Sequence, residues 1–179
     1  MVAISNIVSF RSRVRYNILT PVALLAAGLA GPSFAATTTI TTPTLDVVIA
    51  PGDSLVNEST ITRSANTSAV SAPGNVDTLL NDTPGVIDGN TGSAISIIGT
   101  VNSLNNAGTI QNNTAVAAPA ITVGGHVTQF INTGTVSSTQ TDSGYTSSQA
   151  VVFNSGVDSF LNTGTMTSSL DTGYAGTNV

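Results

Sequence analysis

The side chains that could carry out catalysis are few in this sequence and far apart. Ser54 is a candidate nucleophile, but a serine nucleophile needs a general base and an oriented acid beside it. The only histidine is His126, and no Asp-x-x-His sequence accompanies it. One histidine and no cysteine also disfavour a zinc site. We therefore predict no catalytic, cofactor-binding or metal-binding residues, and we interpret His126 as a loop or bend residue.

Charge excludes another class of function. The chain of 179 residues has four basic side chains, all arginine, and nine acidic ones. Arg11, Arg13 and Arg15 lie within the first 35 residues, so the remainder carries only Arg63 and a net charge of −8. Without a basic patch, binding to nucleic acid or to anionic lipid is disfavoured.

The N-terminal segment differs from the rest of the chain. Its three arginines precede an apolar run over residues 18–29, and Ser33-Phe34-Ala35 supplies small residues at a cleavage site. The run is shorter than the roughly 20 residues that span a bilayer. We predict a signal peptide over 1–35 and export through the inner membrane by the Sec translocon. The absence of cysteine then means that no disulfide stabilises the exported part.

A recurring asparagine pattern decides the fold. Asn-x-Gly-Thr followed by an apolar residue starts at Asn106, Asn132 and Asn162, with a weaker copy at Asn57 and a degenerate one at Asn81. The steps between these asparagines are 24, 25, 26 and 30 residues. A near-constant period of this size is typical of a solenoid, in which one coil cannot bury its apolar face alone.

Apolar residues keep fixed distances from each asparagine. Two residues before it stand Leu55, Leu79, Leu104, Phe130 and Phe160. Four residues after it stand Ile61, Ile110, Val136 and Met166, with the second copy shifted to Val86. Five residues before it stand Val76, Val101, Val127 and Val157. Alternate residues of a strand share a face, so we expect the asparagines to point inward with their apolar neighbours. The odd step of five requires a bend.

Further apolar segments start at Ala94, Ala120 and Ala150 and keep the same period. Each coil therefore reads as three short strands, and about five coils of 24–30 residues should stack in parallel at about 4.8 Å. Stacked asparagine amides can bond one another in a ladder, and the glycine that follows permits a close backbone approach. The polar stretch 137–149 is expected to form a loop on one side, with 171–174 as its counterpart. We assign 36–45 as a lead-in and 46–179 as repeats, incomplete at the C-terminus.

The repeats resemble those of autotransporter (type V secretion) passenger domains of Gram-negative bacteria. The resemblance is carried by Val127-x-x-Phe130-x-Asn132-x-Gly134-Thr135-Val136 and its copies over 101–110 and 157–166. It implies an all-β, right-handed parallel β-helix of the pectin-lyase-like kind, displayed at the cell surface or released outside the cell. It also implies an outer-membrane β-barrel translocator, which we do not find in this sequence. We therefore interpret the chain as the N-terminal part of a longer protein or as a truncated gene product.

A second resemblance suggests an enzyme. Gly52-Asp53-Ser54-Leu55 is similar to the signature of Gly-Asp-Ser-Leu lipases and esterases, some of which are autotransporters. The repeat accounts for this string, however, because Asp53-Ser54-Leu55 aligns with Asp158-Ser159-Phe160. We expect an exported surface scaffold or adhesin-like module with no catalysis of its own and with a host or cell-surface ligand. The alternatives are a passenger-borne esterase, a glycan-active β-helix enzyme and a two-partner secreted adhesin.

Overall fold

Segments rich in threonine, valine and isoleucine form short strands throughout the described chain, because β-branched side chains fit a pleated and half-buried surface. The computed structural model describes residues 35–64, 68–114, 118–140 and 149–170. Within these ranges the fold is all β, and no helix occurs. All but one residue of the predicted signal peptide, 1–35, lies outside the described residues.

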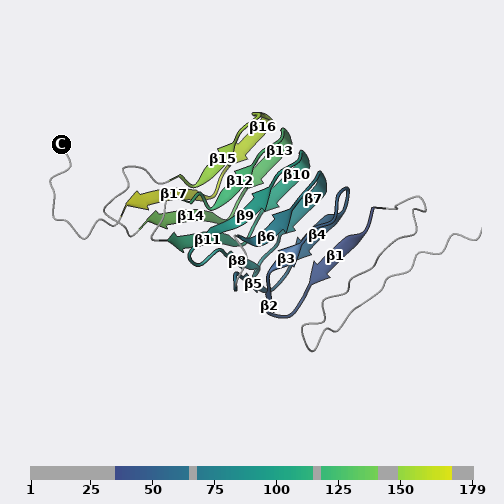
Figure 1. Ribbon diagram of the computed structural model, residues 1–179. Helices are drawn as coiled ribbons and strands as arrows, with labels where there is room; N and C mark the ends of the chain where they lie inside the picture. The colour runs from purple at the N-terminus through teal and green to yellow at the C-terminus, as the bar shows by residue number, and fades with distance from the viewer. Residues whose placement is uncertain (1–34, 65–67, 115–117, 141–148, 171–179) are drawn as a thin grey trace, which may run out of the picture. The chain divides into compact units, whose positions relative to one another are not determined.

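The strands form three parallel sheets, which Figure 1 shows as stacked rungs. The first sheet contains β1 (Thr37–Ile40), β4 (Ser54–Asn57), β7 (Val76–Asn81), β10 (Val101–Asn106), β13 (Val127–Asn132) and β16 (Val157–Asn162). The second contains β2 (Thr44–Leu45), β5 (Thr60–Thr62), β8 (Val86–Asp88), β11 (Thr109–Thr114), β14 (Thr135–Gln140) and β17 (Thr165–Leu170). The third contains β3 (Val47–Val48), β6 (Ser68–Ala72), β9 (Ser93–Ile97), β12 (Ile121–Val123) and β15 (Val151–Phe153).

Every third strand along the chain belongs to the same sheet, so one coil comprises three strands and the fold is a parallel β-solenoid, as predicted. The five repeat asparagines pair in register along the first sheet, which gives four turns from Asn57 to Asn162. The apolar residues two positions earlier pair in the same register and are fully buried in the inner coils. The core is therefore a set of apolar columns running along the solenoid.

The predicted bend lies inside a strand of the first sheet rather than between strands. In β7, Val76 and Leu79 are both buried although they are three residues apart, and Asp77 between them is exposed. Register pairs join Val76 to Val101 and Thr78 to Ser103 but skip Asp77. Strands β10 and β13 show the same pattern. In each of these strands the alternation of inward and outward side chains is therefore shifted by one residue at the same place.

The structure corrects the sequence prediction in the second repeat. Val86 does not take the inward position after Asn81, because it pairs with Thr60 and Thr109 on neighbouring strands. Ile87 takes that position instead, fully buried between Ile61 and Ile110. The turn after Asn81 is two residues longer than the turn after Asn106, so the shift is two residues rather than one.

Two predicted boundaries also differ. The lead-in 36–45 contains β1 and β2, which pair with β4 and β5, so the stacking begins at Thr37, and these two strands belong to the same coil as β3. Within the predicted loop 137–149, residues 137–140 belong to strand β14. Their alternate side chains, Ser138 and Gln140, are buried, which a loop would not require. Residues 141–148 and 171–174 lie outside the described residues.

A ladder of asparagine side chains runs through the solenoid at the bend between the first and second sheets. The Nδ2 atom of Asn57 donates to Oδ1 of Asn81 at 2.7 Å, and Asn81 donates to Asn106 at 2.8 Å. Asn106 donates to Asn132 and Asn132 donates to Asn162, each at 2.7 Å. Each donating amide also bonds a backbone carbonyl of the following coil, at 3.0–3.2 Å. The predicted amide ladder is confirmed.

The glycine two residues after Asn106, Asn132 and Asn162 is required by the closeness of the coils. A Cβ atom built on Gly134 would lie 2.1 Å from the carbonyl oxygen of Gly108, and one on Gly164 would lie 2.1 Å from that of Gly134. Both obstacles are backbone atoms, which cannot move aside as a flexible side chain can. The Asn-x-Gly pattern thus combines an interior hydrogen bond with a close backbone contact.

We expect Asn106→Ala to lower the free energy of unfolding by about 2–4 kcal/mol, because the Asn81 amide loses its ladder acceptor and the buried Oδ1 of Asn132 loses its donor. Urea unfolding followed by circular dichroism measures this loss. Asn102→Ala is the matched control in the same strand, since Asn102 is exposed and bonds only Asp77 through its side chain. The control should change stability by less than about 0.5 kcal/mol. Equal losses in the two variants would contradict the structural role of the ladder.

Candidate functional site

Ser54, the candidate nucleophile, is used to join two coils. It begins β4, is only 8% exposed, and its Oγ atom accepts a hydrogen bond from the backbone N–H of Thr78 at 3.2 Å. The neighbouring Asp53 accepts a hydrogen bond from the N–H of Ala36 at 2.8 Å. Both side chains accept hydrogen bonds from backbone N–H groups of a neighbouring coil.

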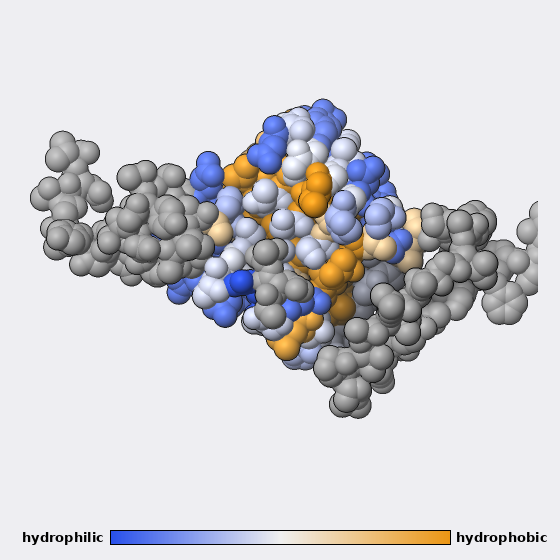
Figure 2. All heavy atoms as spheres, viewed as in Figure 1, coloured by the Kyte–Doolittle hydropathy of each residue, from blue (hydrophilic) through white to orange (hydrophobic). Residues whose placement is uncertain are grey.

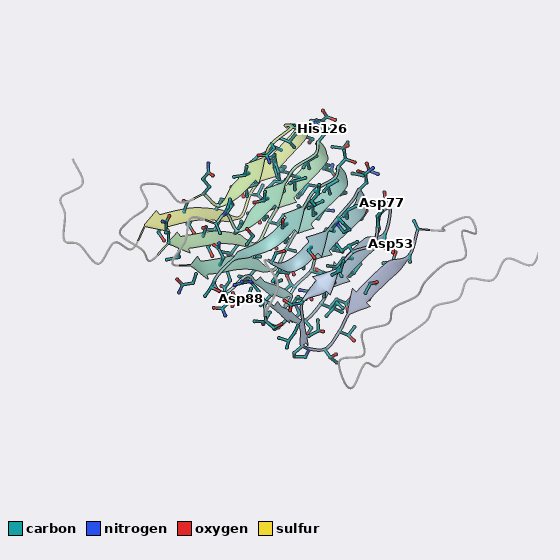
Figure 3. All side chains as sticks on the ribbon, viewed as in Figure 1. Asp53, Asp77, Asp88 and His126 are labelled. Carbon is teal, nitrogen blue, oxygen red and sulfur yellow. The ribbon has the colours of Figure 1, made fainter. Side chains whose placement is uncertain are left out.

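His126 cannot serve Ser54 as a base. It lies directly before β13, whereas Ser54 lies in β4, three strand spacings away in the first sheet. At about 4.8 Å per spacing the stacking alone separates the two residues by about 14 Å, and they also lie at different positions along the strands, so they are far beyond hydrogen-bond reach. Figure 3 shows His126 well apart from Asp53, the residue before Ser54. The structure therefore brings no base to Ser54 from the only histidine of the chain.

The space beside Ser54 is also small. A cavity of about 90 Å³ there is lined by residues of the first two coils, among them Thr38, Ile49, Asp53 and Leu55. Ligand pockets usually measure about 300–1,000 Å³. This cavity has room for a few water molecules and does not form an acyl-binding site.

His126 joins two coils through both of its ring nitrogens. Nε2 lies 2.9 Å from Oδ1 of Asp158, and Nδ1 lies 3.1 Å from the carbonyl oxygen of Ser155. The hydrogen bond to Asp158 raises the pKa of His126, and the bond to Ser155 adds to this effect. Both side chains are open to solvent, at 40% and 63% exposure. The pair is therefore an exposed contact between successive coils rather than a shielded catalytic dyad.

The acidic side chains are spread along the solenoid. Asp53 and Asp77 lie in one row on the first sheet, and Figure 3 shows Asp88 on the other side of the stack. Asp77 accepts a hydrogen bond from Asn102 at 2.9 Å, and Asp88 accepts one from Gln111 at 3.1 Å. In the described ranges, no three histidine, cysteine or acidic side chains come together to hold a metal ion.

A second buried polar group, which the repeat analysis missed, lies on the inner face of the second sheet. Asn112 and Ser138 pair across β11 and β14, and both donate to the carbonyl oxygen of Ala118, at 2.6 and 3.1 Å. Gln140 is buried two residues further along β14, and neither of its amide atoms has a hydrogen-bond partner among the residues that the structure describes. The polar composition of 137–140 resembles a loop, and only the alternation of Val136, Ser138 and Gln140 could have indicated an inward face.

No described segment forms a helix long and apolar enough to cross a membrane. Comparison of the chain with family models, with curated proteins and with solved structures gives no match. Functional assignment therefore depends on the geometry alone. Within the described residues, that geometry assigns the buried asparagines Asn57, Asn81, Asn106 and Asn132 to coil stacking.

The contact between His126 and Asp158 predicts a pH dependence. The pKa of His126 in the folded protein is raised above its ordinary value of 6.5. The pair therefore stabilises the fold fully below pH 6.5, and this stabilisation is lost as the pH rises through the folded pKa of His126. We expect Asp158→Asn to lower the pKa of His126 in an NMR titration, which the single histidine makes unambiguous. The difference in melting temperature between the native protein and the variant should be larger near about pH 5.5 than near about pH 8.5.

Asp77→Asn is the matched control for that titration, because Asp77 occupies the same row as Asp158 but lies three coils away from it. It should leave the pKa of His126 unchanged. An unchanged pKa in Asp158→Asn as well would show that the contact does not persist in solution.

Proposed function

We propose that the chain is an exported β-helical scaffold, comparable to an autotransporter passenger segment, that displays its outward faces at the cell surface as a stalk or adhesin-like module. The observation that carries this proposal is the interior asparagine ladder. Asparagine is the most strongly repeated polar residue, and its side chains form four successive hydrogen bonds between coils. These side chains are therefore used for stacking rather than for catalysis. We propose no catalytic activity for this segment.

The outward face of the second sheet supports a role in surface contact. Its residues are mainly hydroxyl and amide side chains: Thr60, Thr62, Thr109, Gln111, Thr135, Ser137, Thr139, Thr165 and Thr167. Figure 2 shows polar residues on both sides of an apolar band over the face in view. Such a surface is compatible with water and offers hydrogen-bonding groups at the regular spacing of stacked strands. It is therefore suited to display rather than to enclosure of a substrate.

The proposal includes a route of export. The segment 1–35 would direct the chain to the Sec translocon, and a separate outer-membrane translocator would carry it to the surface. A fold without disulfides suits this route, because the stacked core forms without an oxidation step. A host or cell-surface ligand would then contact the outward faces.

Export is tested by expressing the full chain in a Gram-negative host and fractionating the cells. We expect a mature form that begins at Ala36 in the periplasm, identified by N-terminal sequencing. Leu24→Arg combined with Leu25→Arg places two charges in the apolar run and should retain the uncut chain in the cytoplasm.

Asn6→Arg combined with Ser9→Arg is the matched control, because it adds the same two charges before the apolar run, where signal peptides tolerate them. Export of this control should match that of the native chain. Uncut native chain in the cytoplasm would contradict the export part of the proposal.

A further inference from the structure

The last described coil leaves three strands paired on one side only. The first sheet ends at β16, the second at β17 and the third at β15. In the inner coils the corresponding strands pair on both sides. This edge continues the contact that joins every earlier pair of coils, so its hydrogen-bonding and apolar groups are those of the established coil-to-coil interface.

The asparagine ladder has a direction, and it ends at this edge with a donor. Every ladder amide donates to the asparagine of the next coil toward the C-terminus. Asn162 accepts from Asn132, but its own Nδ2 atom makes no hydrogen bond among the described residues. The backbone carbonyl of Asn132 accepts the N–H groups of Thr163 and Gly164 at 2.9 and 3.0 Å. The carbonyl of Asn162 is the corresponding acceptor for a following coil.

The apolar columns reach the same edge. Phe160 and Leu161 are 50% and 49% exposed, whereas Phe130, one coil earlier, is fully buried. The rings of Phe130 and Phe160 are 5.0 Å apart between centroids, so the aromatic stack ends on an open face. A following coil with an apolar residue at this position would cover Phe160 as Phe160 covers Phe130.

The opposite end of the solenoid has different chemistry. Ile40 pairs with Asn57 and occupies the ladder position in the first coil. The Oδ1 atom of Asn57 accepts the N–H of Ser59 at 3.3 Å, so the ladder starts with a satisfied acceptor. Stacking β1 of a second copy on β16 would set an isoleucine against the amide of Asn162 and bury a donor without a partner, which is unfavourable. The edge therefore disfavours head-to-tail assembly of this chain.

We propose that the β15–β16–β17 edge is a docking surface for one further coil of defined sequence chemistry. The occupant is an extended segment that runs parallel to β16 and carries an apolar or aromatic residue, then asparagine two positions later and glycine two positions after that. Its asparagine Oδ1 receives the Asn162 amide, and its N–H groups bond the Asn162 carbonyl. This inference does not depend on export or on a surface role.

The test extends the full chain by repeating residues 151–179 after Val179. The extension preserves the repeat spacing, because Asp171-Thr172-Gly173-Tyr174 corresponds to Asp142-Ser143-Gly144-Tyr145, which precedes the native segment that begins at residue 151. It places a new asparagine 29 residues after Asn162. We expect the melting temperature to rise by about 5 °C. The matched control carries leucine in place of the new asparagine and should gain less than half of that rise. Equal melting temperatures in the two extended chains would overturn the proposal.

A measurement in trans covers the case in which the extended chains do not fold. The probe is a synthetic peptide with the sequence of residues 151–170, added to the full chain and followed by NMR. The side-chain amide of Asn162 and the ring of Phe160 should shift with the native peptide, and a peptide carrying Asn162→Leu should bind at least tenfold more weakly. Equal binding of the two peptides, or shifts at Ile40 instead of Asn162, would overturn the proposal, as would head-to-tail dimers of the full chain in sedimentation.

Discussion

The buried row of asparagine amides is the interaction on which the rest of the structure depends. Each amide in the row must meet the next one directly, so it fixes the lateral register of every coil on its neighbour. A slip of one residue would turn each asparagine and its apolar neighbours to the opposite face. The ladder also explains the glycine that follows, because coils held this closely place a carbonyl oxygen 2.1 Å from where a Cβ atom of Gly134 would stand.

This constraint shapes what the molecule can do. The ladder asparagines are used for stacking, and so is Ser54, whose hydroxyl accepts a hydrogen bond from the next coil. The one histidine of the chain is paired with an aspartate of the next coil on the surface. The described chain thus has a regular interior and outward faces whose composition can vary without disturbing the ladder. Such a division is suited to a scaffold, whose contacts are made by the surface.

The sequence predicted the repeated part of the fold because the interior positions repeat in type. The Leu55-to-Phe160 column and the asparagine row lie where their spacing indicated. The failures occur where a position loses its characteristic residue. The ladder position in the first coil is occupied by Ile40 instead of an asparagine, and residues 36–45 were predicted to be a lead-in, although β1 pairs with β4 as the later strands pair. Ile87 was missed because the number of residues inserted in the turn after Asn81 is visible only from strand pairing.

The polar sites were harder to predict than the core. Ser138 and Gln140 have the composition of a loop, and nothing in their types shows that they point inward. The pairing of His126 with Asp158 crosses from one coil to the next, so it depends on a register that the sequence alone specifies only approximately. Contacts between coils are set by backbone stacking, and sequence spacing predicts them only where every coil has the same length.

Hydrogen exchange of the asparagine side-chain amides, followed by NMR, tests the central claim most directly. The account predicts that the Nδ2 protons of Asn81, Asn106 and Asn132 exchange much more slowly than those of Asn102, which is exposed in the same sheet. Asn162 accepts a hydrogen bond from Asn132, but its own Nδ2 atom donates none among the described residues. Its Nδ2 protons should therefore exchange at a rate near that of Asn102. Similar rates for all five amides would contradict an interior ladder that holds the coils together.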